Sequence, residues 1–213
     1  MLTRSTPADL LSALRRAGIA EPRLLDAVRA VPRAAFVPPN LVDRAYLDAP
    51  LPIPHGQVTT QPSLVARMVD ALALTGDERV LEIGTGYGWQ TALLGRLAHE
   101  VWSVERWPDL AHAARENLAQ QGAVNATVVV GDGSEGLPAH APYDAILVSA
   151  AFLEVPEPLA EQLPHGGRLV QPVGPGGSED VMLFERGPRD LVAVRTIVGA
   201  HFVRLVGRRA FPA

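Results

Sequence analysis

Hydrophobic residues recur at helical spacing in three stretches of the first 75 residues. Within 7–17, 21–31 and 63–74, apolar positions lie three or four residues apart, which places them on one buried face of a helix. Thr6, followed by a proline, is typical of a helix start, because its hydroxyl can cap a free backbone N–H. Prolines interrupt the pattern across residues 32–62, so the sequence predicts a loop-rich segment there.

From residue 78 the pattern changes to short apolar runs that alternate with amphipathic stretches. The sequence predicts strands at 79–83, 101–104, 126–130, 143–148 and 167–173, with helices at 90–98, 108–121 and 156–162. Strands that alternate with helices form right-handed βαβ units on a parallel sheet. The predicted fold class is therefore α/β, with a Rossmann-like, doubly wound and mostly parallel sheet.

The last part of the chain has no helix between its strands. Residues 181–185 and 191–198 are predicted strands, and 202–206 is expected to extend the second. Such neighbours form an antiparallel hairpin, which is expected to close one edge of the sheet. The length fits a single domain. Its expected parts are an N-terminal helical and loop segment (1–75), a core (76–175) and the C-terminal strands (176–213).

Charge and composition remove several classes of function. The net charge of -4 and the lack of any long basic cluster argue against binding to nucleic acid. The chain has no cysteine, which excludes disulfides, thiolate catalysis and cysteine-bound zinc. All 19 basic residues are arginine, so lysine chemistry is excluded as well. The six histidines lack ligand spacing, so no metal site is expected.

The sequence also carries no pattern typical of export or of a membrane. Residues 1–10 are polar and lack the apolar stretch of a signal peptide. No apolar run approaches the roughly 20 residues that a membrane-spanning helix needs. We expect a cytoplasmic protein with no membrane partner, and a monomer.

The run VLEIGTGYGWQ at residues 80–90 is the strongest motif. It follows a predicted strand and opens a predicted helix, and its glycines permit a tight turn against a ligand. The spacing G-x-G-x-G differs from the dinucleotide pattern G-x-G-x-x-G. Glu82 would repel pyrophosphate but suits the cationic end of S-adenosylmethionine. The candidate cofactor ligands in this run are Glu82, Gly84, Thr85, Gly86, Gly88 and Gln90.

Two further acids follow the next two predicted strands. Glu105 ends the second strand, where an acid in nucleoside-binding folds accepts hydrogen bonds from ribose hydroxyls. Asp132, beside Gly133, follows the third strand and could bind the adenine amino group. Plain alternatives are a solvated acid for Glu105 and an Asx-turn for Asp132. Because the carboxyl ends of neighbouring strands form the ligand crevice of open α/β sheets, we expect these acids to converge there.

Several segments together resemble the protein-L-isoaspartate O-methyltransferase family. In chain order they are 31–38, 45–48, 51–53, 56–62, 80–90, 131–137, 143–151, 166–174 and 202–205. The resemblance covers about residues 30 to 206. The segments around Pro32, Gln57 and Phe202 are more particular than the cofactor motif, which many methyltransferases share.

The resemblance implies transfer of a methyl group from S-adenosylmethionine to the α-carboxylate of L-isoaspartyl residues in damaged proteins or peptides. S-adenosylhomocysteine is the product, and the ester then cyclises to a succinimide that leads to repair. An ionised carboxylate is already a nucleophile at neutral pH, so the reaction needs alignment rather than a base or a metal.

The resemblance also implies site residues. Thr60 matches the family's serine and is the candidate catalytic hydroxyl, with a helix cap as the alternative. Val203 matches a residue whose backbone holds the peptide, with a core strand position as the alternative. The other candidate substrate-binding residues are Gln57, Thr59 and Gln61. His55, in the same loop, could contact a substrate carboxylate.

The chain departs from the family pattern mainly in this loop. The family usually has glycine, threonine, isoleucine and serine where this chain has Pro54, Val58, Thr59 and Thr60, and it often has proline at Arg204. Three alternatives to repair stand, and the altered loop supports only the one without catalysis. They are methylation of an aspartate in a dedicated peptide precursor, a cofactor-binding relative without catalysis, and a dehydrogenase, which Glu82 and the glycine spacing disfavour.

Overall fold

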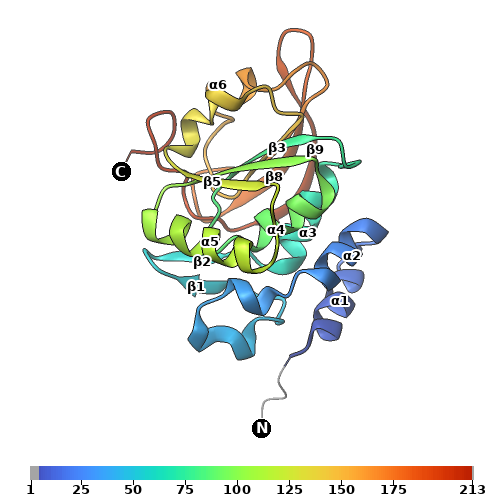
Figure 1. Cartoon of the computed structure of the whole chain (residues 1–213). Coiled ribbons are helices and arrows are strands. Elements are labelled where there is room, and N and C mark those ends of the chain that lie inside the picture. Colours follow the sequence, from blue (N-terminus) through green and yellow to red (C-terminus); the bar gives the residue numbers. More distant parts are fainter. Residues whose placement is uncertain (1–4, 213) are drawn as a thin grey trace.

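A mixed seven-stranded sheet forms the centre of the computed structural model, which describes residues 5–212 (Figure 1). Its spatial order is β5-β4-β3-β6-β7-β8-β9. The strands are β3 (Arg79–Ile83), β4 (Glu100–Glu105), β5 (Ala126–Val130), β6 (Ala145–Val148), β7 (Arg168–Val173), β8 (Glu179–Arg186) and β9 (Leu191–Ala200). Strands β3 to β7 are parallel, whereas β8 and β9 pair antiparallel. The predicted fold class is confirmed.

The order of the strands reverses between β3 and β6. From β3 the chain moves outward through β4 to β5, and it then returns to β6 on the other side of β3. In open α/β sheets this switch point opens a crevice at the carboxyl ends of the two strands. The topology therefore places a ligand crevice at the ends of β3 and β6.

Helices cover both faces of the sheet. The connecting helices are α4 (Trp89–Leu97), α5 (Pro108–Gln120) and α6 (Glu157–Glu161). Helices α4 and α5 lie on one face and α6 on the other (Figure 1). The N-terminal helices are α1 (Pro7–Arg16), α2 (Pro22–Ala30) and α3 (Pro62–Ala71), and they pack beside α4 and β9. None of the helices within residues 5–212 is long and apolar enough to cross a bilayer.

Local signals explain why the N-terminal helices form where they do. Thr6 accepts a hydrogen bond from the backbone of Asp9, and Asp9 accepts one from the backbone of Thr6, so the predicted cap is a full capping box. Leu10, Leu11 and Leu14 form the buried face of α1. The other helices and strands predicted within residues 5–200 begin and end within three residues of the bounds that the structure shows.

The segment 32–62 is more ordered than predicted. It forms two 3-10 helices, η1 (Arg33–Phe36) and η2 (Pro39–Arg44), and a small antiparallel hairpin of β1 (Leu51–Ile53) and β2 (Gln57–Thr59). The sequence did not indicate the hairpin because strands of three residues, one with a proline inside, show no alternation.

The prediction that 202–206 extends β9 is wrong. Glu179 accepts a hydrogen bond from the Phe202 N–H at 2.7 Å, and the chain then leaves the sheet. Val203 and Leu205 instead hydrogen-bond through their backbones to Ala151, beyond the end of β6, at 2.8 and 2.7 Å. This turn brings the C-terminal segment to the carboxyl end of the sheet.

The turn before β3 depends on a buried carboxylate. Glu78 accepts hydrogen bonds from the backbone N–H groups of Thr75 and Gly76 at 2.9 Å, and from the Thr75 hydroxyl at 2.9 Å. Burial by itself would raise the pKa of Glu78, but these hydrogen bonds outweigh it and lower the pKa to about 2. The ionised form of Glu78 therefore stabilises the fold above the ordinary carboxyl pKa, and this contribution is lost as the pH falls from about 4.5 through 2.

We predict that Glu78→Gln lowers the free energy of unfolding at pH 7 by roughly 1–3 kcal/mol, because buried N–H groups lose a charged acceptor. Asp77→Asn changes the exposed acid next to it and should cost less than about 0.5 kcal/mol. Urea unfolding at pH 7 and pH 3 measures both. Equal stability of Glu78→Gln and wild type at pH 7 would contradict this account.

Candidate active site

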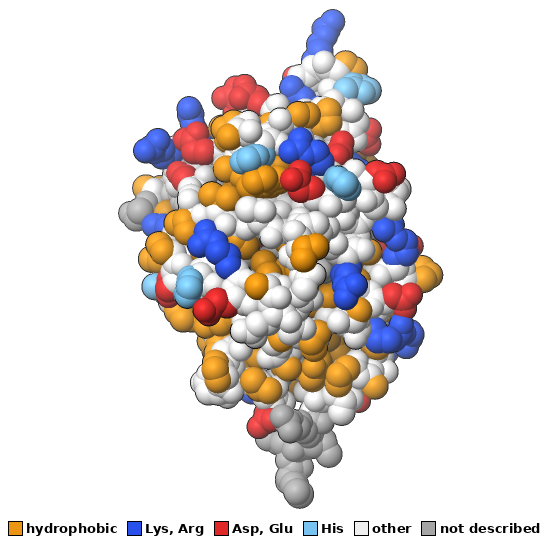
Figure 2. Space-filling model, in the orientation of Figure 1, with side chains coloured by type: hydrophobic (Ala, Val, Ile, Leu, Met, Phe, Trp, Pro, Cys, Tyr) orange, Lys and Arg blue, Asp and Glu red, His pale blue; other side chains and the backbone are white. Residues whose placement is uncertain are grey.

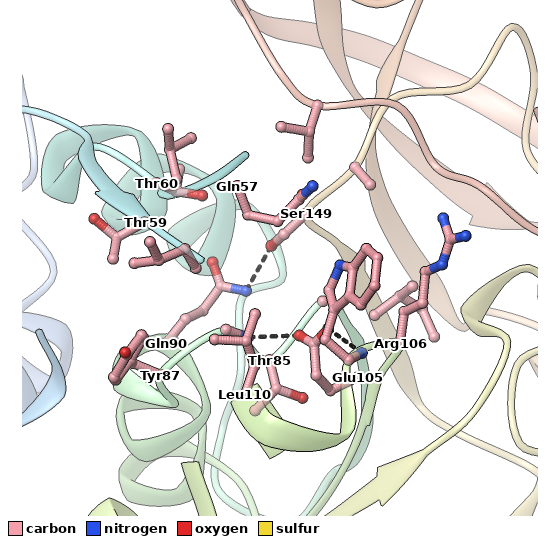
Figure 3. A pocket seen from close by; sticks show the side chains of 18 of the residues that line it. Gln57, Thr59, Thr60, Thr85, Tyr87, Gln90, Glu105, Arg106, Leu110 and Ser149 are labelled. Carbon is pink, nitrogen blue, oxygen red and sulfur yellow. Dashed lines mark hydrogen bonds between the residues drawn. The ribbon is translucent and has the colours of Figure 1, made fainter. Parts of the chain in front are cut away.

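One cavity opens at the carboxyl ends of β3, β4 and β6, where the strand order reverses. The space of about 1080 Å³ within its walls includes open solvent, so the cavity is accessible from outside the protein. Of the predicted site residues, those on its wall are Gln57, Thr59, Thr60, Gly84, Thr85, Gly86, Gly88, Gln90, Glu105, Gly133 and Val203. Glu82, Gln61 and Asp132 do not line it. Figure 3 shows the labelled residues around the cavity, and they come from the hairpin segment, the glycine turn, the strand ends and helices α4 and α5.

The glycine turn after β3 adopts the backbone that its sequence predicts. Gly84, Gly86 and Gly88 all have positive φ, at 94°, 56° and 92°. A Cβ on Gly86 would meet only the tip of Ile53, so a side chain there would extend into the cavity. A Cβ on Gly133 would lie 2.3 Å from Ile83 Cγ2, so this position needs glycine for close packing.

Glu82 lies behind the cavity wall rather than on it. Its carboxylate is fully buried and accepts hydrogen bonds from the side chains of Gln90, Thr91 and Ser103. Burial raises the pKa of Glu82, the three hydrogen bonds lower it and the nearby Glu105 carboxylate raises it, and the net result is a pKa of about 7. Glu82 was expected to face the cationic end of S-adenosylmethionine, but its position behind the wall gives it no direct contact with a ligand in the cavity.

Gln90 presents an acceptor without a partner. Its Nε2 donates to Glu82 at 2.8 Å and to the Ser149 hydroxyl at 2.9 Å, which fixes the orientation of the amide. Its Oε1 is buried and has no hydrogen-bond partner among residues 5–212. A buried unpaired acceptor is costly, so this atom suits a ligand that carries an N–H donor. Ser149 itself, at the end of β6, is a cavity residue that the sequence did not single out.

Glu105 combines structural contacts with free acceptor capacity. One carboxylate oxygen accepts the Gly86 N–H at 2.8 Å and the other accepts the Trp107 N–H at 3.0 Å. Only 5% of the residue is exposed, and it lines the cavity. A carboxylate has about four lone-pair sites, so ligand hydroxyls can still be bound.

Asp132 is directed toward the C-terminal segment. Its carboxylate accepts hydrogen bonds from the N–H and hydroxyl of Ser134 and from the Arg208 N–H at 2.7 Å. Burial tends to raise the pKa of Asp132, but these contacts outweigh it and lower the pKa. The Asx-turn alternative is therefore what the structure shows, and only its neighbour Gly133 reaches the cavity.

The residues of the hairpin loop divide into two groups. The Thr59 hydroxyl accepts hydrogen bonds from Arg33 and from the Leu51 N–H, and Gln61 donates to Asp48 and Ser63. These contacts hold the loop in place. Gln57 donates to the carbonyl of His55, within the hairpin turn, and also lines the cavity.

Thr60 faces the cavity with its hydroxyl unused. The N-cap residue of α3 is Gln61, whose side chain accepts no hydrogen bond from the helix backbone, so Thr60 is not the helix cap. Within residues 5–212 its hydroxyl makes no hydrogen bond, and Figure 3 shows it beside the same opening as Gln57 and Ser149. The hydroxyl is therefore free to donate to a ligand.

Arg33 is a structural centre of the site that the sequence did not identify. Its guanidinium, with the residue only 1% exposed, donates to the Thr59 hydroxyl and to the Thr60 carbonyl. It also donates to the carbonyls of Ala45, Leu47 and Ala49. Burial lowers the pKa of Arg33 to about 10, so it stays charged at neutral pH. An arginine inside the apolar run 31–37 was the available signal.

His55 has a partner inside the protein. Its ring stacks on Trp107 with centroids 3.9 Å apart, and its Nε2 lies 2.9 Å from Asp109 at the start of α5. The His55 contact lowers the pKa of Asp109. These contacts join the hairpin turn to the segment after β4. The carboxylate beside His55 in this structure is that of Asp109, whereas the sequence suggested a substrate carboxylate there.

Acidic and basic side chains are intermixed on the face of the molecule shown in Figure 2. Residues 5–212 contain no group of three or more histidine and acidic side chains that could hold a metal ion.

Comparison with known proteins agrees with this geometry. The family model of protein-L-isoaspartate(D-aspartate) O-methyltransferase matches residues 5–210. The chain is 52% identical to a protein-L-isoaspartate O-methyltransferase of Methanoculleus marisnigri, over 92% of this chain and 88% of that protein. It is 49% identical to one of Myxococcus xanthus, over 94% of this chain and 95% of that protein.

Solved structures give the same result. A protein-L-isoaspartate O-methyltransferase superimposes with a TM-score of 0.83 at 28% identity, over 96% of this chain and 67% of that one. A Plasmodium falciparum protein, solved in complex with S-adenosyl-L-homocysteine, has the same fold, with a TM-score of 0.80 at 21% identity over 92% of this chain and 96% of that one. The chain therefore belongs to the protein-L-isoaspartate(D-aspartate) O-methyltransferase family.

Proposed function

We propose that this protein transfers the methyl group of S-adenosylmethionine to the α-carboxylate of L-isoaspartyl residues in damaged proteins and peptides. The ester then cyclises to a succinimide, and its hydrolysis restores part of the normal aspartate. The observation that carries the proposal is the family match over residues 5–210, together with a cavity at the β3–β6 switch point.

The residues around the glycine turn fit this cofactor. The unpaired Gln90 Oε1 suits the ammonium of its amino-acid end, and the remaining lone pairs of Glu105 suit the ribose hydroxyls. Gly84 and Gly86 keep the wall free of side chains. Glu82 acts through Gln90, whose amide it orients. When bound, S-adenosylmethionine supplies an electrophilic methyl group on a sulfonium.

The acceptor side needs alignment rather than a base. An isoaspartyl carboxylate is ionised at neutral pH, so its oxygen carries the attacking lone pair without proton transfer. The free hydroxyl of Thr60 can donate to the other oxygen and so fix the direction of attack. Arg33 holds the carbonyl of Thr60 at 3.4 Å, which keeps that hydroxyl at the cavity. Val203, in the segment that follows β9, also lines the cavity and is proposed to support the peptide backbone.

The cellular location, the oligomeric state and the binding partners are part of the same proposal. We place it in the cytoplasm as a monomer that acts on proteins and peptides and binds neither nucleic acid nor membrane. The lack of cysteine and the net charge of -4 support this proposal. Cell fractionation and light scattering test the location and the monomeric state.

The reaction itself is tested with two peptides that differ only in an isoaspartyl or a normal aspartyl linkage. We expect methyl transfer from labelled S-adenosylmethionine to the isoaspartyl peptide alone. Equal labelling of both peptides, or of neither, would refute the proposed substrate.

Glu105→Gln should weaken the binding of S-adenosylhomocysteine by roughly 1.5–3 kcal/mol, because hydrogen bonds between ribose hydroxyls and a charged acceptor are lost. Glu116→Gln is the matched control, since Glu116 is an exposed acid on α5. Titration calorimetry measures both variants. An unchanged affinity in Glu105→Gln would remove Glu105 from the ribose site.

Thr60→Val keeps the shape of the side chain and removes its hydroxyl. We expect single-turnover methyl transfer to slow about 10- to 100-fold, as the loss of one hydrogen bond to a charged group implies. Thr60→Ser keeps the donor, so its rate should match wild type or exceed it. The affinity for S-adenosylhomocysteine should stay unchanged in both. A wild-type rate in Thr60→Val would show that the hydroxyl plays no part.

A further inference from the structure

Arg204 is an exposed arginine on the cavity wall whose side chain is fixed from three sides. Its Nε donates to the carbonyl of Pro175 at 3.0 Å, and its guanidinium lies 4.9 Å from the centre of the Phe211 ring. Its stem crosses Gly176, where a Cβ would be only 2.7 Å from Arg204 Cγ. Exposed arginines are normally free to move, so these contacts prepare a defined position for the charge.

The ends of this guanidinium are free. Among residues 5–212, no carboxylate forms an ion pair with Arg204, and its two Nη nitrogens make no hydrogen bond. The positive charge of Arg204 is therefore not neutralised by direct contact with a carboxylate of these residues. A planar guanidinium with both terminal nitrogens available matches a carboxylate in a bidentate pair.

Sheet order places Arg204 away from the cofactor residues. Arg204 pairs with Ala151, which lies after the end of β6. Phe152, the residue that follows Ala151, pairs with Val173 of β7. Glu105 ends β4, on the other side of β3. Arg204 follows Val203, which is proposed to support the substrate peptide. Arg204 therefore lines the cavity beside the part that is proposed to receive the peptide.

We propose that Arg204 binds a second carboxylate on the substrate, the side chain of an acidic residue next to the isoaspartate, and so makes this enzyme prefer acidic sequences. This inference rests on the proposed function. An acidic side chain is the favoured source, because isoaspartate inside a protein is seldom beside a C-terminal carboxylate.

The test uses isoaspartyl peptides with blocked ends that carry Glu, Gln or Arg beside the isoaspartate. A fourth peptide has neutral neighbours and a free C-terminal carboxylate. We expect wild type to use the Glu peptide with a kcat/KM about 10-fold above that of the Gln peptide, as one charge-assisted pair implies. The Arg peptide should be used least.

Arg204→Gln should lower the ratio between kcat/KM for the Glu peptide and kcat/KM for the Gln peptide from about 10 to about 1. Arg204→Lys should retain part of the preference, because lysine keeps the charge but not the bidentate geometry. Arg189→Gln removes the same charge at an exposed position between β8 and β9, and it should keep the full preference.

The binding of the same peptides with S-adenosylhomocysteine present, followed by fluorescence anisotropy, separates this inference from the proposed function. A Glu preference in binding that Arg204→Gln abolishes supports Arg204 even if no methyl transfer occurs. A preference that survives in Arg204→Gln, or none in wild type, overturns the assignment. A preference only for the peptide with the free C-terminus overturns the side chain as the source.

Discussion

The carboxylate of Glu82 has no access to water, and the arrangement of the cavity depends on how the protein satisfies it. Its three partners come from different elements: Gln90 and Thr91 from the first turn of α4, and Ser103 from β4. Gln90 passes the connection on to Ser149 at the end of β6. Because a half-satisfied buried carboxylate is costly, the central strands and α4 can adopt only the arrangement that meets all these bonds.

A second buried charge organises the other half of the cavity in a different way. Among residues 5–212, Arg33 forms no ion pair with a carboxylate, and it instead donates to carbonyls and a hydroxyl of two segments, 45–49 and 59–60. Loops with little secondary structure have many unpaired carbonyls, and one guanidinium with five donors can satisfy several of them. The side of the cavity at the glycine turn is thus ordered by a buried acceptor, and the side at the hairpin by a buried donor. The contact between His55 and Trp107 joins the two halves.

The sequence predicted features that depend on local pattern, and it failed where long-range partners decide. The βαβ order and the glycine turn follow from periodicity and from φ preferences, and they were predicted closely. The position of Glu105 follows from its place at a strand end. By contrast, nothing local shows that Glu82 turns inward or that Asp132 bonds the backbone of Arg208, 76 residues away. The course of 202–206 was also missed, because its partner is Ala151.

The cavity walls come from segments that lie far apart along the chain, from η1 to the residues that follow β9. Bringing such distant segments together costs loop-closure entropy before any contact compensates for it, which makes this part of the molecule slow to assemble. A partly folded chain with a formed central sheet would still have no complete place for nucleoside or peptide. Ligands of the cavity consequently bind the native state alone, and by mass action their presence raises the temperature at which the whole domain melts.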